Sequence, residues 1–235
     1  MLKVELHTHT ADDPLDYIPH SVHDLIDRAV SLGYQALAIT LHDKQLDLKP
    51  FRTYAADRGV VLISGVERTI DGCHVLLLNF PLNAQADRIR TFEGIGRLKA
   101  DRPTGIVVAP HPFFPLSFCL GDRLDRYADL FDAVEQNALY SRYINFNTAV
   151  ERWAREHQKP VVGNADVHRL EQLGYTYSLV DACPEPDAIC VAIRNGQVMV
   201  ESRPLGTLQL GLIAAKQLSS GVIGRWTHRH AAAHG

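Results

Sequence analysis

Two histidines two residues apart stand near the start of the chain, in the stretch VELHTHT that begins at Val4. The stretch is typical of a short β-strand that runs into a loop, and side chains two residues apart in a strand point to the same face. We therefore expect His7 and His9 to direct their imidazoles at one point. The chain has 12 histidines and 4 cysteines, a balance that favours imidazole-based over thiolate-based metal chemistry.

Further polar residues follow other apolar stretches of the chain. They come within four residues after QALAIT, VVLISGV, GIVVAP and KPVVGN, and the candidates are His42, Glu67, His111, Asp166 and His168. In a parallel barrel the carboxyl ends of the strands meet on one face, where active sites are built. We therefore expect these residues to meet in one cleft. His74 is an exception, because it opens the stretch HVLLLNF instead of ending one.

The candidate set consists of imidazoles and carboxylates, which are ligands that suit Zn, Mn or Fe. It holds more ligands than one four-coordinate ion uses. Two or three divalent ions that share a bridging carboxylate would accommodate it. Two ions roughly 4 Å apart can clamp a phosphoryl group and activate a water. The sequence thus predicts a cofactor of two or three divalent ions.

These residues are positioned by elements that alternate along the chain. Strands are expected at 2–7, 35–40, 60–67, 74–80, 105–110, 130–136, 159–165 and 197–202, and helices at 21–34, 49–59, 83–100, 145–158 and 185–196. Apolar strands that alternate with helices predict an α/β fold with a parallel sheet, and six or more such units predict a closed or nearly closed barrel. We expect a barrel domain over 1–205 and a C-terminal helix with a flexible tail over 206–235. The HRH repeat at His228 and His230 joins no other candidate in that tail.

Charge and composition indicate which kinds of binding partner to expect. The formal net charge is −3, which argues against a surface that neutralises a nucleic-acid backbone. No apolar run approaches the ~20 residues that span a bilayer, and the N-terminus lacks the order of a signal peptide. The cysteines form no CxxC pair, so we interpret them as reduced thiols. We expect a cytoplasmic protein with a small-molecule substrate, no membrane partner and no polymeric nucleic acid.

The stretches ELHTHT, AITLHD, GVE, HPF and NADVH, in this order, resemble the PHP (polymerase and histidinol phosphatase) superfamily over residues 1 to about 200. The ordered set carries the resemblance, since a lone HxH would be weak evidence. It implies a distorted TIM-like barrel of seven βα units with a metal cluster at the C-terminal ends of the strands. It also implies a stand-alone, metal-dependent phosphoesterase.

The resemblance further implies three groups of metal ligands. One ion would be held by His7, His9, Glu67 and Asp166. Glu67 would bridge to a second ion, which is also held by His74 and His111. A third ion would be held by His42, His168 and one residue of the loop after His9. That loop, ADDPLDYIPH, departs from the family pattern; we favour Asp13 as the ligand and leave Asp12, Asp16 and His20 open.

The implied reaction is phosphomonoester hydrolysis on a small metabolite, such as a nucleotide, a sugar phosphate or an amino-alcohol phosphate. The nucleophile would be a metal-bridging hydroxide, and the catalytic residues would be Glu67, Asp166 and His42. Phosphate oxygens outside the metal ions usually bind Arg. We name Arg142 first for this role, followed by Arg169 and Arg123, and we interpret Glu135 as hydrogen-bonded near the cleft.

Three other functions stay open. The first is a nuclease or phosphodiesterase of the polymerase-associated PHP type. The second is a non-catalytic PHP domain that binds a partner, and the third is a metal-dependent amidohydrolase. Fold alone does not choose among them.

Overall fold

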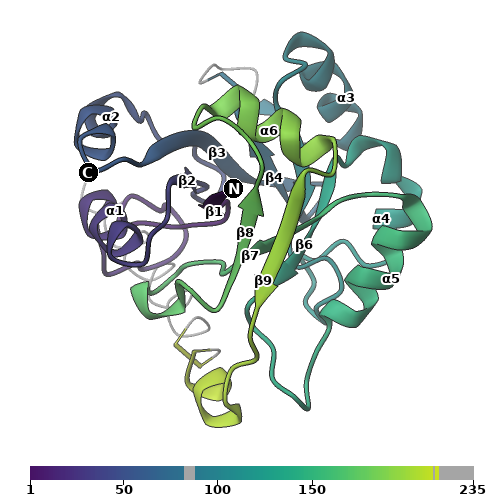
Figure 1. The fold of residues 1–235 in the computed structure, drawn as a ribbon. Helices are drawn as coiled ribbons and strands as arrows, with labels where there is room; N and C mark the ends of the chain where they lie inside the picture. The colour runs from purple at the N-terminus through teal and green to yellow at the C-terminus, as the bar shows by residue number, and fades with distance from the viewer. Residues whose placement is uncertain (82–87, 214, 217–235) are drawn as a thin grey trace, which may run out of the picture.

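One mixed β-sheet forms the centre of the computed structural model, with helices packed around it (Figure 1). The structure describes residues 1–81, 88–213 and 215–216. The strands are β1 (Leu2–Glu5), β2 (Ala36–Ile39), β3 (Val61–Ile70), β4 (Cys73–Leu78), β5 (Ile106–Ala109), β6 (Ala133–Asn137), β7 (Val161–Asn164), β8 (Thr176–Val180) and β9 (Val198–Ser202). The helices are α1 (Val22–Ser31), α2 (Lys49–Ala56), α3 (Phe92–Asp101), α4 (Arg123–Arg126), α5 (Asn147–His157) and α6 (Pro186–Arg194), with 3₁₀ helices η2 (Ala128–Leu130) and η3 (Leu170–Gln172).

The sheet has the order β7-β6-β5-β4-β3-β2-β1-β8-β9. The pairs β1/β2, β2/β3, β5/β6 and β6/β7 are parallel, as the alternation of elements predicts. The sheet is not parallel throughout, because β4, β8 and β9 run antiparallel to their neighbours. For β4 the reason is local: Asp71 and Gly72 join it to β3 with φ values of 48° and 82°. Two consecutive residues with positive φ are typical of the tight turn of a β-hairpin.

Gly163 brings the two ends of the sheet together. Its N–H donates to Ser178 Oγ (2.9 Å), and that hydroxyl donates to Gly163 O (3.1 Å), so β7 lies against β8. A Cβ at this position would lie 2.7 Å from Val200 Cγ1 and 2.8 Å from the Tyr177 carbonyl oxygen. A residue without a side chain is therefore required where β7 meets β8 and β9. This contact makes the sheet a nearly closed, TIM-like barrel.

Apolar side chains from successive strands fill the barrel. Val4, Ile63, Val108 and Val162 are fully buried in one cluster, and α6 packs against the same cluster through Ile193. Burial of a side chain of this size contributes about 1.5–3 kcal/mol relative to exposure. The strands are thereby held rigidly beneath the loops that follow them.

Several elements differ from the expectation, and the short helix α4 was not predicted. Strand β8 (Thr176–Val180) was not predicted from the sequence. Helix α3 begins at Phe92, and residues 82–87, where the predicted helix begins, lie outside the described residues. Residues 207–213 are helical, as expected for the start of the C-terminal segment. His228 and His230 of the predicted tail lie outside the described residues. The boundary between a barrel domain and a C-terminal segment at residue 205 stays a prediction. Within the described ranges, no helix has both the length and the apolar character to cross a bilayer.

Candidate metal centre

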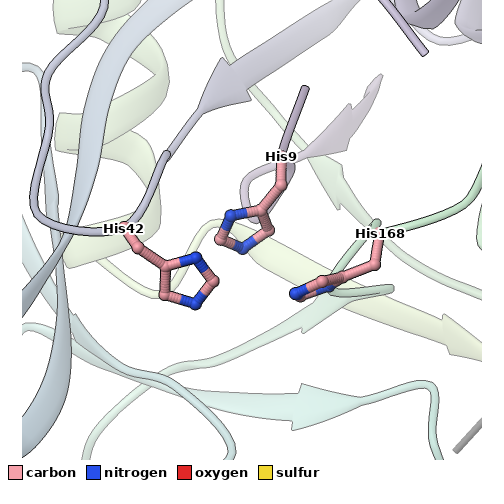
Figure 2. Close-up of side chains that lie close together, drawn as sticks. All are labelled: His9, His42 and His168. Atoms are coloured by element: carbon pink, nitrogen blue, oxygen red, sulfur yellow. The ribbon is translucent and has the colours of Figure 1, made fainter. Parts of the chain in front are cut away.

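The predicted ligands converge at the C-terminal end of the parallel strands, although they are separated by up to 161 positions in the chain. Four groups of three side chains each bring one ligand atom per residue within 4.8 Å of the others. The groups are His9/His42/His168, His7/His9/Asp166, His7/Glu67/His111 and His42/Glu67/His74. Figure 2 shows the first of them, with three imidazoles turned towards a common space.

His74 joins this cluster because β4 is antiparallel. In the β3/β4 register Thr69 lies opposite His74 and Glu67 lies opposite Leu76. The first residues of β4 therefore lie beside the last residues of β3. A histidine that opens a strand reaches the same end of the barrel as those that follow strands.

The carboxylate of Glu67 occupies the centre of the cluster and is 1% exposed. Its Oε1 lies 2.7 Å from His74 Nδ1 and 3.1 Å from His111 Nε2. Its Oε2 faces three Nε2 atoms, those of His7 at 3.2 Å, His9 at 3.4 Å and His42 at 3.2 Å. The two oxygens thus serve two separate sets of imidazoles, which is the arrangement that a bridging carboxylate requires.

Asp166 lies on the Oε2 side of Glu67. Its Oδ1 is 3.4 Å from His7 Nε2, 3.5 Å from His9 Nε2 and 3.3 Å from His168 Nδ1. The backbone of Asp166 has a φ of 51°, an unfavourable value for a residue with a side chain. Gln172 Nε2 donates to its carbonyl oxygen (2.9 Å) and helps to hold this conformation. Strain of this kind costs on the order of 1–3 kcal/mol and is concentrated at functional sites.

Several buried polar atoms in the cluster make no hydrogen bond with any described residue. They are His7 Nε2, His9 Nε2, His74 Nδ1 and Asp166 Oδ1. A buried polar atom without a partner costs about 1–3 kcal/mol, so native proteins rarely tolerate it without another ligand. These four atoms face the same space, and all of them are metal-ligand types. The residues present therefore fit a metal cluster.

Asp13, which we favoured as a ligand, lies behind the imidazoles. Its Oδ2 is 2.9 Å from His9 Nδ1 and 3.0 Å from His42 Nδ1, and it also accepts from the His42 backbone N–H (3.0 Å). The Nε2 atoms of both rings face Glu67 instead. Asp13 belongs to none of the four groups found among the described residues. Its position suits a residue that orients two imidazoles and fixes which nitrogen carries the proton.

The alternatives in this loop also occupy defined positions. Asp16 Oδ2 lies 3.1 Å from Nε2 of His168, which is one of the predicted ligands. His20 Nε2 donates to the His9 carbonyl oxygen (2.9 Å), whereas Asp12 accepts from Thr10 Oγ1 (3.3 Å). Asp13 Oδ1 accepts from the backbone N–H of Asp16 (3.0 Å), so it also shapes the turn that presents this side chain.

Glu135 forms a second layer beneath the cluster, as expected. It is fully buried, and its Oε2 accepts from His7 Nδ1 (2.9 Å) and Asn164 Nδ2 (2.9 Å). Its Oε1 accepts from Asn137 Nδ2 (2.8 Å) and the His111 backbone N–H (3.2 Å). Sequence reasoning missed Glu5, which is fully buried and accepts from the backbone N–H of His7 (3.2 Å). A charged residue inside an apolar strand was the signal that could have identified it.

The carboxylates and imidazoles of the cluster stabilise each other's charged forms. Burial lowers the pKa of His7, but the carboxylates of Asp166, Glu67 and Glu135 outweigh it and raise this pKa to about 10. Burial and His9 lower the pKa of His168, yet Asp166 and Asp16 raise it to about 9. Burial opposes ionisation of Glu67, but the surrounding imidazoles hold its pKa well below the usual range. Protons balance the carboxylates without metal, and divalent ions would replace those protons.

The three candidate phosphate-binding arginines differ in their surroundings. Arg123 Nη1 donates to Asp71 O (2.7 Å) and Cys73 Sγ (3.0 Å), so its guanidinium is already engaged. Arg169 directly follows His168, and its buried Nε makes no hydrogen bond with any described residue. Arg142 is exposed on the loop between β6 and α5. A cavity of about 370 Å³ elsewhere, lined in part by Lys49, Arg52 and Arg102, shares no residue with the cluster.

A family model described as PHP-associated matches residues 145–198. This segment runs from α5 into β9 and includes Asp166 and His168. No curated protein matches the chain in sequence.

Several solved structures share its fold. One is a two-domain protein from Bacteroides vulgatus, described as containing a predicted PHP-like metal-dependent phosphoesterase (TM-score 0.67, 16% identity, 86% of this chain and 65% of that chain). Another is PsfC from Pseudomonas syringae (0.62, 17%, 94% and 98%). A third is the lesion-specific endonuclease EndoQ from Pyrococcus furiosus (0.56, 16%, 85% and 57%). The chain thus spans less than two thirds of the first and third. The chain thus shares the fold of these structures, and one segment of it matches a PHP-associated family model.

Proposed function

We propose that the protein is a metal-dependent hydrolase of phosphate esters, with small phosphomonoesters as substrates. The observation that carries this proposal is the position of Glu67, whose two oxygens face two separate sets of imidazoles. A carboxylate that touches two cations is the central element of a site that acts on phosphoryl groups with more than one ion.

We propose three positions for divalent ions, and the geometry supports them. His7, His9 and Asp166 would hold one ion on the Oε2 side of Glu67, and His74 and His111 would hold another on the Oε1 side. The third position combines His42 and His168, with Asp16 in place of Asp13 as the loop carboxylate. When bound, ions of this kind supply an activated water and offset the negative charge of the phosphate. The imidazole and carboxylate ligands suit Zn, Mn or Fe.

The residues around the ions are proposed to have distinct roles. Glu67 and Asp166 set the spacing of the ions, and Asp13 and Glu135 hold the imidazoles in the metal-binding tautomer. Arg169 and Arg142 are proposed to bind the phosphate oxygens that face away from the ions. Arg169→Ala and Arg142→Ala would then raise KM with unchanged metal content.

A nuclease is the second candidate, and the shared fold of EndoQ favours it. A nuclease has to hold a polyanion along its length, for which basic patches are typical. The chain has 24 Lys and Arg against 27 Asp and Glu. This balance favours a small substrate with a single terminal phosphate.

The test combines elemental analysis of the purified protein with a phosphate-release screen. The panel contains nucleotide, sugar and amino-alcohol monoesters, and oligonucleotides with and without an abasic position serve as competing substrates. We expect two or three ions per chain and release of phosphate from monoesters, with fewer ions and no phosphate release in Asp166→Ala. Efficient cleavage of oligonucleotides without any monoester turnover would favour the nuclease. A wild-type protein that refuses added Zn and Mn would overturn both functions.

A further inference from the structure

The five imidazoles that face Glu67 fall into two classes by what lies behind them. His7, His9 and His42 all present Nε2 to Glu67 Oε2, and each directs Nδ1 at a carboxylate. The partner is Glu135 for His7 (2.9 Å) and Asp13 for His9 (2.9 Å) and His42 (3.0 Å). A carboxylate in this position makes the opposite ring nitrogen a stronger metal ligand and fixes its tautomer.

The imidazoles on the Oε1 side of Glu67 lack such support. His111 presents Nε2 to Oε1 (3.1 Å), but its Nδ1 faces the Sγ of Cys119 at 3.4 Å. A thiol is a weak hydrogen-bond acceptor. His74 presents Nδ1 to the same oxygen, and its ring stacks on Phe118 with centroids 4.5 Å apart. Among the described residues, no side chain forms a hydrogen bond with its other nitrogen.

One loop, residues 111–122, supplies both of these unusual neighbours. The Cys119 N–H donates to Leu116 O (3.1 Å), and the Phe118 carbonyl accepts from the His74 backbone N–H (2.8 Å). Cys119 is 9% exposed, so solvent has little access to its thiol. The sulfur lies on the side of the His111 ring away from Glu67. It can therefore act on a bound ion only through the imidazole.

We infer that the ion on the Oε1 side of Glu67 is the most weakly held and exchangeable one, and that Cys119 sets its affinity by positioning His111. The inference rests on the proposed function, because it concerns an ion of the same site. Loss of a partner behind a metal-binding imidazole typically lowers metal affinity 10–100-fold. Because carboxylates support the rings on the other side, a change at Cys119 affects one ion and spares the rest.

The test measures the affinity of each ion by stepwise removal of Zn²⁺ with a chromophoric chelator. Cys119→Ala is expected to weaken the most labile ion about 10–100-fold and to leave the others unchanged. Cys119→Asp supplies a carboxylate and is expected to tighten that ion, and Cys119→Ser is a conservative second variant that keeps a polar partner. Cys190→Ala is the matched control, because Cys190 is fully buried in α6 and away from the cluster.

A second comparison shows whether the thiol acts through His111. In a His111→Ala background, Cys119→Ala is expected to have no further effect on metal affinity. Co²⁺ loading is expected to give no sulfur-to-metal charge-transfer band.

Weakening of all ions together, weakening of a tightly held ion, an unchanged Cys119→Ala protein or a charge-transfer band would each overturn the inference. In those cases the wild-type protein still binds metal, so the proposed function stands. A wild-type protein without metal would remove the proposed function itself.

Discussion

Asp13 offers the most direct test of how the site is organised. One oxygen of its carboxylate accepts from the Nδ1 atoms of His9 and His42, and the other accepts from the backbone N–H groups of Leu15 and Asp16. In Asp13→Asn one oxygen becomes an NH₂ group. Whichever way the amide turns, this group faces N–H donors. The variant therefore loses the support of both imidazoles or the turn of the loop.

The magnitude follows from the number of rings that are affected. Each orienting partner typically contributes a factor of 10–100 in metal affinity, so two rings give about 10²–10⁴ where the losses add. This range equals about 3–6 kcal/mol of binding free energy. Because Asp13 is proposed to orient ligands and not to bind an ion, the number of ions at saturating metal is expected to be unchanged.

The assay is a chelator-competition titration, combined with elemental analysis at saturating metal. Asp12→Asn is the matched control, because Asp12 is an exposed neighbour outside the imidazole contacts. Asp16→Asn is the contrasting variant, because Asp16 is proposed to be a ligand. It is expected to lose one ion that saturating metal does not restore. If Asp13→Asn also lost an ion at saturation, Asp13 would be a ligand after all. An unchanged affinity in Asp13→Asn and also in Asp13→Ala, which removes both oxygens, would refute the orienting role.

Further predictions concern the charges and the packing of the barrel. Glu67→Gln is expected to lose more metal than any single imidazole variant and nearly all hydrolysis, because the amide has one ligand oxygen and no charge; equal loss in His74→Ala would contradict this. His7 and His168 have pKa values of about 10 and about 9 without metal, so metal binding near pH 7 should release protons and stop doing so above about pH 10. Calorimetry in buffers of different ionisation enthalpy measures this release. Gly163→Ala is expected to lower the free energy of unfolding by about 1–3 kcal/mol in denaturant titrations, because the added methyl group meets a backbone carbonyl.

The convergence of distant residues was predictable because it depends on a rule about strand ends. His9, His42 and His168 each follow a strand that runs parallel to its neighbour, so their positions follow once the strands are recognised. The direction of β4 was not inferred, although Asp71-Gly72 between two apolar runs is a recognised hairpin signal. Without the direction of β4, nothing in the strand pattern placed His74 near the other candidate ligands.

The roles of Asp13 and Cys119 could not be predicted from spacing. Position in the chain shows that Asp13 is near His9, but not whether its carboxylate meets the metal-facing nitrogen or the opposite one. That choice depends on how residues 11–20 turn, and the Asp13 carboxylate itself helps to fix the turn. Cys119 is eight residues from His111, and only the folded loop brings the sulfur to its Nδ1.

The antiparallel hairpin contributes to the asymmetry of the site. His7, His9 and His42, which follow the parallel strands β1 and β2, present Nε2 to the Oε2 atom of Glu67, whereas His111, which follows β5, presents Nε2 to Oε1. His74 enters from a strand that runs the opposite way, and it presents Nδ1 to Oε1. The loop that packs against this hairpin, residues 111–122, then places Cys119 and Phe118 where carboxylates stand on the other side. The reversal of one strand thus brings a further ligand to the cluster and gives the two oxygens of Glu67 different chemical surroundings.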